Sequence, residues 1–321
     1  MPDTPPPGRV VIAGASGLIG RALVASLVGD GISVVRLVRR RPDADGPGPA
    51  AGSGEPAADD AELVDDRPWT PGEPLDPAVV DGASSVVCLN GASLGRFPWT
   101  ARYKRELVWS RLTPTQTLAA AVRAAGGSPT FVGASAVGYY PTDGAGELTE
   151  RSPRGETFLA DLCGEWETAA RGAGPAARVV HLRTAPITHP GGVLAPLVLL
   201  TRLGLSGPIG RGTQAWPWIG LDDEIRAIRH VMAADVDGPV NLSGPTRATA
   251  NDLGFAVARR LNRPYLLRAP EWGMRLVLGR DATEAILTSD MHVVPAVLQA
   301  SGFEFTHPTV EDAVAAALPA A

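Results

Sequence analysis

The sequence predicts an α/β protein built on a doubly wound parallel sheet, with a smaller C-terminal part. Three observations predict this fold. The apolar run Arg9 to Gly14 ends in glycine, which is typical of a buried strand. Leu18 to Val28 places apolar residues at helical spacing, and Ser33 to Val38 is a second β-branched run. Strand, glycine turn, helix and strand within about 30 residues form the βαβ unit that opens such a sheet.

Apolar runs alternate with amphipathic stretches along the rest of the chain. Further strands are predicted at Ser85 to Leu89, Thr130 to Ala134, Arg178 to Arg183 and Pro239 to Leu242. Helices are predicted at Trp99 to Ala125, Glu156 to Arg171, Asp222 to Ala234, Ala250 to Leu261 and Val310 to Leu318. Gly191 to Trp218 is rich in glycine and proline, which predicts an irregular wall over the sheet.

The turn after the first strand carries three glycines at even spacing, Gly14-x-x-Gly17-x-x-Gly20. The first glycine permits a tight turn, the second lets the backbone approach a pyrophosphate, and the third allows close packing of helix on strand. Free N–H groups and the positive end of the helix dipole then face the phosphates. A glycine-rich turn without a ligand is the alternative. The context favours a Rossmann-type NAD(P)-binding site, which also includes Ser16, Leu18 and Ile19.

The end of the second strand indicates which dinucleotide binds. NAD sites usually place an acidic residue there, to bind the ribose hydroxyls. Here Val38 is followed by Arg39 and Arg40, and guanidinium groups suit a 2′-phosphate in charge and geometry. We therefore expect NADP(H) in preference to NAD(H), with a solvated basic run as the alternative.

The chain is divided by composition. We expect residues 9–185 to form the NAD(P)-binding domain. Residues 186–321 then form a mixed region that returns a strand near 239–242 to the sheet and builds the smaller substrate-side domain. Residues 42–61 consist almost entirely of Pro, Ala, Gly, Asp, Ser and Glu. Such a segment buries too little surface to order itself, so it is predicted to be a flexible surface loop, or alternatively a flap over the cofactor.

Charge and cysteine content exclude several classes of protein. The formal net charge is -5, so we expect no general attraction to nucleic acid or to an anionic membrane. Only Cys88 and Cys163 occur, which excludes a disulfide framework and fits a reducing compartment. The five histidines lack metal-ligand spacing, so no metal is expected. No signal core and no spanning apolar run is present, and we expect a cytoplasmic protein.

A resemblance to a known family is carried by several segments, which read RVVIAGASGLIGRAL, VVCLNGAS, GASAVGYY, GPIGRGTQAWPWIGLDD and VPAVLQASGFEF. Together they resemble the atypical extended short-chain dehydrogenase/reductases, in their nucleoside-diphosphate-sugar-epimerase-like (YfcH-like) branch with its C-terminal domain of unknown function. The resemblance runs from about Arg9 to Ala317, without the low-complexity insert. It implies a Rossmann domain, bound NADP(H) and a small C-terminal domain that closes a cleft, but no particular substrate.

The resemblance also implies cofactor contacts beyond the glycine turn. The loop after the strand at Ser85 lines the cofactor, and a later helix supports it; a surface ion pair between the two helix residues, Glu106 and Arg111, is the alternative. The family loop usually reads Asn-Leu-Ala-Gly, whereas this chain reads Cys-Leu-Asn-Gly, so the asparagine has moved. The residues implied are Leu89, Asn90, Gly91, Glu106, Arg111 and Ile187.

For catalysis, Ser135 matches the serine that hydrogen-bonds the reacting oxygen in related reductases and epimerases. Those enzymes add a Tyr-x-x-x-Lys relay about two dozen residues later, in which lysine lowers the tyrosine pKa. Glu156 to Cys163 contains neither residue. Tyr139 and Tyr140 are the remaining phenols, either as proton donors or as walls of a pocket. Asp161 is a further candidate acid.

On the substrate side, the resemblance covers Gly207 to Asp223. Arg211 and Gln214 are expected to bind a polar or anionic substrate, and Trp216 and Trp218 to shape the wall. A structural clasp between the two domains is the alternative for the tryptophans.

These features favour an NADP(H)-dependent oxidoreductase or epimerase-like enzyme that acts on a small polar carbonyl or alcohol. The missing relay leaves two alternatives open. One is a non-redox NADP(H)-binding sensor or partner-binding protein, and the other is a redox-neutral isomerase or dehydratase with retained cofactor. A small-molecule substrate is the expected partner, and a homodimer is compatible with the sequence.

Overall fold

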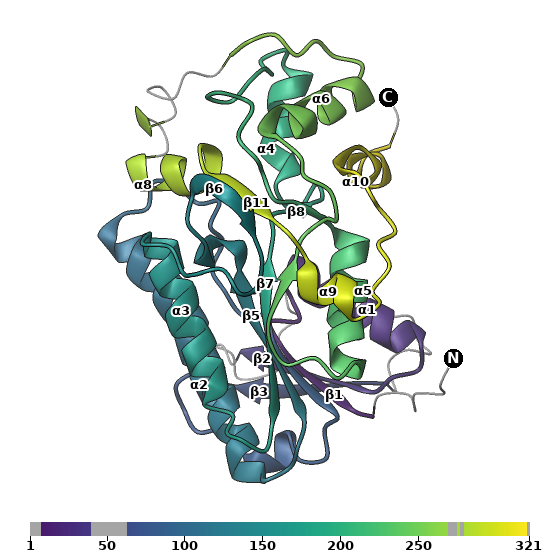
Figure 1. The fold of residues 1–321 in the computed structure, drawn as a ribbon. Helices are drawn as coiled ribbons and strands as arrows, with labels where there is room; N and C mark the ends of the chain where they lie inside the picture. The colour runs from purple at the N-terminus through teal and green to yellow at the C-terminus, as the bar shows by residue number, and fades with distance from the viewer. Residues whose placement is uncertain (1–7, 40–62, 269–274, 277–278, 320–321) are drawn as a thin grey trace, which may run out of the picture.

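A computed structural model describes residues 8–39, 63–268, 275–276 and 279–319 (Figure 1). Within these residues, a sheet of seven parallel strands has the order β10-β7-β5-β4-β1-β2-β3. This order reverses direction at β1, so the predicted doubly wound α/β fold is confirmed. The strands are β1 (Val10–Ala13), β2 (Val34–Arg39), β3 (Val64–Trp69), β4 (Ser85–Cys88), β5 (Thr130–Ala136), β7 (Arg178–Thr184) and β10 (Gly238–Leu242).

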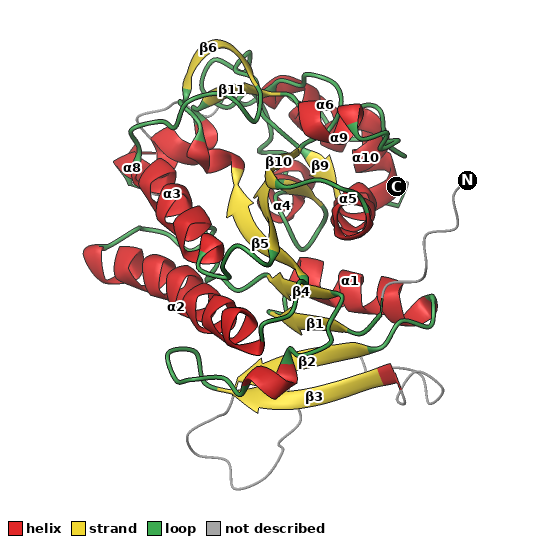
Figure 2. Cartoon of the chain, turned by 60° about the horizontal axis from the view of Figure 1, so that its bottom comes forward, coloured by secondary structure: helices red, strands yellow, loops and turns green. Residues whose placement is uncertain are grey.

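Helices cover both faces of this sheet, and two apolar cores fill the layers between (Figure 2). One core joins alternate residues of β1, such as Val10 and Ile12, to α1 and α5. The other joins Val11 and Ala13 to α2 and α3. The helices are α1 (Leu18–Gly29), α5 (Leu221–Ala233), α2 (Ala101–Ala125) and α3 (Phe158–Arg171). Because both faces are buried, the central strands are continuous apolar runs.

Side-chain caps determine where the two longest helices begin. The Thr100 hydroxyl accepts a hydrogen bond from the Tyr103 N–H, and Thr157 accepts one from Ala160 in the same way. Each cap satisfies a backbone donor of the first turn. For this reason α2 and α3 each start two residues later than the sequence predicts.

An edge strand and a helix within residues 191–218 differ from the sequence prediction. The strand β3 was not predicted, because Val64–Trp69 holds two acids, an arginine and a proline; as the edge strand it leaves these exposed, and an edge tolerates proline. The prediction that all of Gly191 to Trp218 is irregular is wrong, because α4 spans Leu194–Arg202. Pro196 lies in the first turn of α4, where its missing N–H costs no helical hydrogen bond.

The C-terminal half packs above the carboxyl edge of the sheet (Figure 1). Its own core contains Trp216 and Trp218 between α4, α6 (Ala250–Arg260) and α10 (Val310–Ala317). This part also contains two short pairs of parallel strands. They are β6 (Asp143–Leu148) with β11 (Asp290–Val293), and β8 (Ile187–Thr188) with β9 (Ile219–Gly220). The remaining short elements are η2 (Pro77–Val79), η3 (Val137–Tyr139), α8 (Arg280–Ala282), the π-turn η4 (Thr283–Leu287) and α9 (Ala296–Ala300).

The β6–β11 pair crosses the predicted domain boundary at residue 185, because β6 precedes that boundary and β11 follows it. Beyond β9 and α5, the chain returns to the main sheet through β10 beside β7. The predicted flexible loop at 42–61 lies outside the described residues. In the part of the chain that the structure describes, no helix has both the length and the apolar character needed to cross a membrane.

Candidate cofactor and substrate site

The glycine turn lies between β1 and α1, directly against the chain that leaves β4. Gly14 has φ +86, and a Cβ on it would stand 2.7 Å from the carbonyl carbon of Leu89. A Cβ on Gly20 would stand 2.3 Å from the carbonyl oxygen of Gly14. Both contacts are far inside van der Waals distance. These two positions therefore need glycine so that the helix, the turn and the neighbouring loop can pack.

Gly17 differs, because the protein itself leaves room for a side chain there. Its φ is -73, and a Cβ would meet only the Gly14 carbonyl oxygen, at an ordinary 3.4 Å. Gly17 is also the N-cap of α1, which has neither a side-chain cap nor an acidic residue in its first turn. Open space beside uncapped N–H groups at the positive helix end is what a phosphate requires. The turn fits a dinucleotide pyrophosphate.

The other residues predicted around the turn have mixed environments. Ser16 is exposed, and its carbonyl oxygen accepts a hydrogen bond from Arg21 at 2.7 Å. Leu18 and Ile19 pack partly into the core beneath α1. At the end of β2, Val38 is half-buried and Arg39 is exposed. Arg40, predicted to share the 2′-phosphate with Arg39, lies outside the described residues.

The loop after β4 is supported from below by Arg111. A Cβ on Gly91 would lie 3.2 Å from the Arg111 guanidinium carbon, which stands 5.2 Å above the centre of the Trp166 ring. Arg111 donates to the carbonyl oxygens of Ala92 and Leu107, and burial lowers its pKa. Glu106 is exposed, and among the described residues no ion pair joins it to Arg111. The surface-pair alternative is therefore wrong.

Ser135 lies in a buried polar network rather than on an open surface. It is 4% exposed, and its hydroxyl donates to Glu167 Oε1 at 2.9 Å. Glu167 also accepts two hydrogen bonds from Arg183, at 2.8 and 3.0 Å. Burial alone would lower the pKa of Arg183, but the bonded Glu167 carboxylate and Tyr140 raise it above its ordinary value. The pair is therefore a buried salt bridge.

The network continues from Arg183 to β10. Arg183 donates to the Tyr140 hydroxyl at 2.9 Å, and that hydroxyl donates to Asn241 Oδ1 at 2.6 Å. The backbone N–H of Asn241 donates to Glu150 Oε1 at 3.0 Å. Glu150 Oε1 also accepts from the N–H of Val297 at 3.1 Å, just beyond β11. The network thus links the main sheet to the C-terminal half.

The two predicted tyrosines have different surroundings. Tyr140 is 0% exposed, and burial raises its pKa to about 12 although Arg183 opposes this shift. Tyr140 has no exposed surface, and its hydroxyl is bonded to Arg183 and Asn241, so its role toward a substrate stays a prediction that this structure does not favour. Tyr139 is half-buried, and its ring lies 3.5 Å from the Arg183 guanidinium carbon. Of the two phenols, Tyr139 keeps a free edge.

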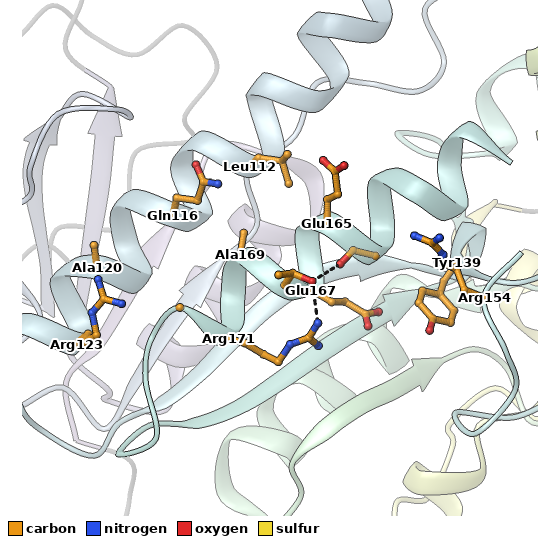
Figure 3. Close-up of a pocket in the computed structure, with 13 residues that line it drawn as sticks. Leu112, Gln116, Ala120, Arg123, Tyr139, Arg154, Glu165, Glu167, Ala169 and Arg171 are labelled. Carbon is orange, nitrogen blue, oxygen red and sulfur yellow. Dashed lines mark hydrogen bonds between the residues drawn. The ribbon is translucent and has the colours of Figure 1, made fainter. Parts of the chain in front are cut away.

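A groove of about 750 Å³ runs between α2 and α3, with Tyr139 and Arg154 at one end and Arg123 at the other (Figure 3). Its middle is lined by small or polar residues, including Gln116, Ala169 and Thr168. No residue of the glycine turn lines it. The groove is therefore separate from the cofactor turn.

Three of the four predicted substrate residues form a clasp instead. Gln214 is 1% exposed and donates to the carbonyl oxygens of Ile209 and Leu287. The Trp216 indole also donates to Leu287, and the Trp218 indole to the Thr246 carbonyl. The clasp describes these three better than substrate contact does, because they are buried and their side-chain N–H groups are bonded to backbone, although Gln214 Oε1 has no partner among the described residues.

Arg211, the fourth, has a side chain 68% exposed and an ion pair with Asp290 at 2.8 Å. Its substrate role stays a prediction. Ile187, predicted at the cofactor, is buried in β8. Asp161 is exposed and lies 3.4 Å from Arg154. Burial raises the pKa of Cys163 to about 12, so this thiol is an inert core group.

Sequence reasoning missed Glu167, Arg183, Asn241 and Glu150. One signal was available for two of them. Arg183 and Asn241 each stand inside an apolar strand, RVVHLRT and GPVNL. A polar side chain in a strand buried on both faces needs a partner, since an unpaired buried charge is costly. The identity of the partner could not be read from the sequence.

The reversal of strand order at β1, the glycine turn at that point and the open side of Gly17 define a dinucleotide-binding protein of the Rossmann class. The chain belongs to the NAD-dependent epimerase/dehydratase family, whose model matches residues 10–243. A domain of unknown function (DUF1731) matches residues 269–317. The resemblance seen in the sequence is confirmed.

Relatives cover nearly the whole chain. The epimerase family protein Mb2239 of Mycobacterium bovis is 38% identical over 310 residues, which cover 95% of this chain and 96% of the relative. The crystal structure of human epimerase family protein SDR39U1 with NADPH has a TM-score of 0.79 at 28% identity, covering 96% of this chain and 98% of that one. A nucleoside-diphosphate sugar epimerase from Corynebacterium glutamicum has a TM-score of 0.73 at 29% identity, covering 97% of this chain and 58% of that one.

Proposed function

We propose that this chain binds NADP(H) at the carboxyl edge of its sheet and acts on a small polar carbonyl or alcohol as an oxidoreductase or epimerase-like enzyme. One observation carries the binding step: Gly17 is glycine although nothing in the described protein requires it there. Gly14 and Gly20 are explained by internal packing. Gly17 is explained by the pyrophosphate of a bound dinucleotide, which approaches the first turn of α1.

The preference for the 2′-phosphorylated cofactor is supported by Arg39. This exposed side chain ends β2, two strands from the β4 loop and next to the glycine turn on β1. A guanidinium group there pairs with a phosphate, whereas an acid would repel it. The human relative SDR39U1, whose structure contains NADPH, supports the same choice.

The bound nicotinamide would supply hydride chemistry, and the protein would orient the substrate. Ser135 gives its only proton to Glu167, so its free lone pairs suit an alcohol donor better than a carbonyl oxygen. Tyr139, held against Arg183, is the phenol with remaining exposed surface. We therefore assign the reacting oxygen to Ser135 and Tyr139 rather than to Tyr140.

A second candidate is an NADP(H)-binding protein without redox turnover. It is favoured by the same network, because the hydroxyls of Ser135 and Tyr140 are already bonded inside the protein. Incubation of the full chain with NADPH and a panel of small carbonyls and alcohols separates the candidates. Cofactor oxidation supports an oxidoreductase; product without net cofactor change supports a redox-neutral isomerase or dehydratase; no product with intact binding supports the sensor.

The cofactor assignment is tested by calorimetric titration with NADPH and NADH. We expect NADPH to bind at least about tenfold more tightly, a preference worth roughly 1.4 kcal/mol. Arg39→Glu should erase it. Arg67→Glu, which changes an exposed arginine on the neighbouring β3, serves as the control and should leave the preference intact. Equal affinities in the unmodified chain would refute the assignment.

We further propose that the protein is a homodimer located in the cytoplasm. The groove between α2 and α3 has small residues on its floor and the half-exposed Trp109 farther along α2, features that suit contact with a second copy in a homodimer. Light scattering of the eluted protein measures this directly. Two buried free thiols, Cys88 and Cys163, suit the cytoplasm that we propose as its location.

A further inference from the structure

The C-terminal half exposes a group of leucines where α4, the turn that follows it and the segment after α6 meet. Among the described residues, nine large apolar side chains are exposed, and six of the nine belong to this group. Their exposed fractions lie between 41% and 78%. The six, which form the leucine face, are Leu199, Leu200, Leu203, Leu205, Leu266 and Leu267. A monomer seldom gathers so much apolar surface in one place unless something binds there.

Backbone hydrogen bonds hold the leucine face together as one surface. The Leu205 N–H donates to the Leu200 carbonyl oxygen at 2.8 Å, which folds the chain back at the end of α4. The N–H groups of Leu266 and Leu267 both donate to the Ser206 carbonyl oxygen, at 2.9 and 3.0 Å. The chain after α6 therefore lies directly beside the chain that leaves α4. The leucines of the two segments are neighbours although they are far apart in the sequence.

The charges in these segments have one sign. Residues 194–210 contain one arginine and residues 253–268 contain four, and neither segment contains aspartate or glutamate, in a chain whose formal net charge is -5. Four of the five arginines are exposed and have no ion pair among the described residues; they are Arg202, Arg259, Arg263 and Arg268. Asp252, the acid just before the second segment, is already used in the capping box of α6. The net charge is thus an average that conceals a basic, apolar region.

An apolar surface with arginines around it requires an occupant that is both apolar and anionic. A second copy that met this surface with its own leucine face would bring arginines against arginines, and this repulsion opposes such a contact. The leucines also protrude: the exposed fraction is 78% for Leu266 and 63% for Leu203. Protruding side chains suit a fluid lipid layer, which fills the space around them, and guanidinium groups pair with lipid phosphates.

We infer that the leucine face binds the surface of a membrane that contains anionic phospholipids. The leucine side chains enter the boundary between head groups and acyl chains, and the four exposed arginines bind the phosphates of the head groups. The protein lies on the membrane and does not span it. The attachment is independent of the proposed NADP(H) chemistry, because the leucine face contains no residue of the glycine turn or of the Arg183 network.

The test is sedimentation of the full-length chain with vesicles of phosphatidylcholine, either alone or mixed in equal parts with phosphatidylglycerol. The unmodified chain should bind the anionic vesicles at least about tenfold more tightly, and high salt should weaken this binding because it screens exposed charges. Arg263→Gln combined with Arg268→Gln should weaken binding about tenfold, since each arginine contributes separately at an anionic surface. Arg102→Gln combined with Arg105→Gln removes two exposed arginines of α2 and is the matched control, which should bind normally.

The apolar contribution is tested in the same vesicles. Leu203→Ser combined with Leu266→Ser should weaken binding at least about tenfold, because two apolar side chains no longer enter the lipid. Trp109→Ser removes an apolar side chain of α2 that is 51% exposed and should bind normally.

Equal binding of the unmodified chain to both kinds of vesicle would overturn the inference, as would normal binding by both double variants of the leucine face and its arginines. A leucine variant that only converts a dimer into a monomer in light scattering would also overturn it, since the face would then join two copies. Thermal unfolding checks that each variant is folded. If a variant does not fold, the comparison of the two vesicles with the unmodified chain still decides.

Discussion

The glycine turn after β1 and the polar network around Arg183 lie at strand ends of one sheet, yet they are built in different ways. The turn uses seven consecutive positions, from Gly14 to Gly20, and its geometry depends on backbone and on the absence of side chains. The network uses side chains of β5, α3, β7 and β10 that are up to about a hundred residues apart, as in the Tyr140–Asn241 bond.

This difference decides what each region can offer a ligand. The backbone N–H groups at the start of α1 have no side-chain cap, so they remain available. In the network, the polar atoms of Ser135, Glu167 and Arg183 are already bonded to one another. Satisfied buried polar groups rigidify a fold but have little capacity left for substrate. Binding and catalysis therefore have unequal support in this molecule.

The largest effect on cofactor binding is expected at Gly17. Gly17→Val should abolish NADPH binding, a loss of more than about 100-fold, because its methyl groups enter the space that the pyrophosphate needs. The fold should persist, since a Cβ there meets the protein only at 3.4 Å. Calorimetry and circular dichroism measure both. Gly29→Val, at the open end of α1 where a Cβ meets nothing within 4 Å, is the matched control. Retained affinity in a folded Gly17→Val protein would show that the phosphates bind elsewhere.

The network should respond in the opposite manner, through stability rather than binding. Glu167→Gln leaves the Arg183 guanidinium buried without a counter-charge, which should lower the free energy of unfolding by roughly 3–5 kcal/mol. NADPH affinity should stay within about threefold, since no network bond involves the glycine turn. Glu165→Gln changes an exposed acid on the same helix and should cost less than about 0.5 kcal/mol. If the Glu167→Gln protein were as stable as the unmodified chain but did not bind NADPH, the network would serve binding rather than stability. Denaturant unfolding and titration supply both numbers.

The smallest effect is a pH dependence at Glu224, behind the end of β7. This side chain is 0% exposed and accepts one hydrogen bond from Thr184, while Oε2 has no partner among the described residues. Burial raises its pKa to about 8, from an ordinary value of 4.5. At pH values between these two, the unfolded chain releases the proton and the folded chain keeps it. Stability therefore falls as the pH rises through this window and becomes level above it.

Glu224→Gln should remove this slope, because the amide does not ionise. The unmodified chain should lose about 2 kcal/mol relative to the variant between pH 6 and 7.5. Urea unfolding at several pH values measures the difference. Parallel curves for the two proteins over this range would show that Glu224 is already ionised in the fold.

Much of the architecture could be predicted because its signals are local. The spacing of Gly14, Gly17 and Gly20 after an apolar strand predicted both the βαβ unit and the position of the turn. The strand β3 was not predicted, because an edge strand exposes polar residues and so lacks the apolar pattern. The helix α4 was not predicted, because its segment is rich in proline and glycine. Pro196 nevertheless lies in the first turn of α4, where a helix tolerates proline.

The sequence by itself determined the doubly wound sheet and the glycine turn, because periodicity and glycine spacing act between near neighbours in the chain. Only the tertiary structure decided the roles of the polar residues. In the folded protein, Tyr140 is buried and Ser135 donates a hydrogen bond to Glu167. Gln214 and Trp216 both donate to the Leu287 carbonyl oxygen and so form the clasp. Such roles depend on which distant partner satisfies a buried donor or acceptor, and a buried polar group must find one. That choice is made when the layers pack, since only packing brings residues a hundred positions apart within hydrogen-bond distance.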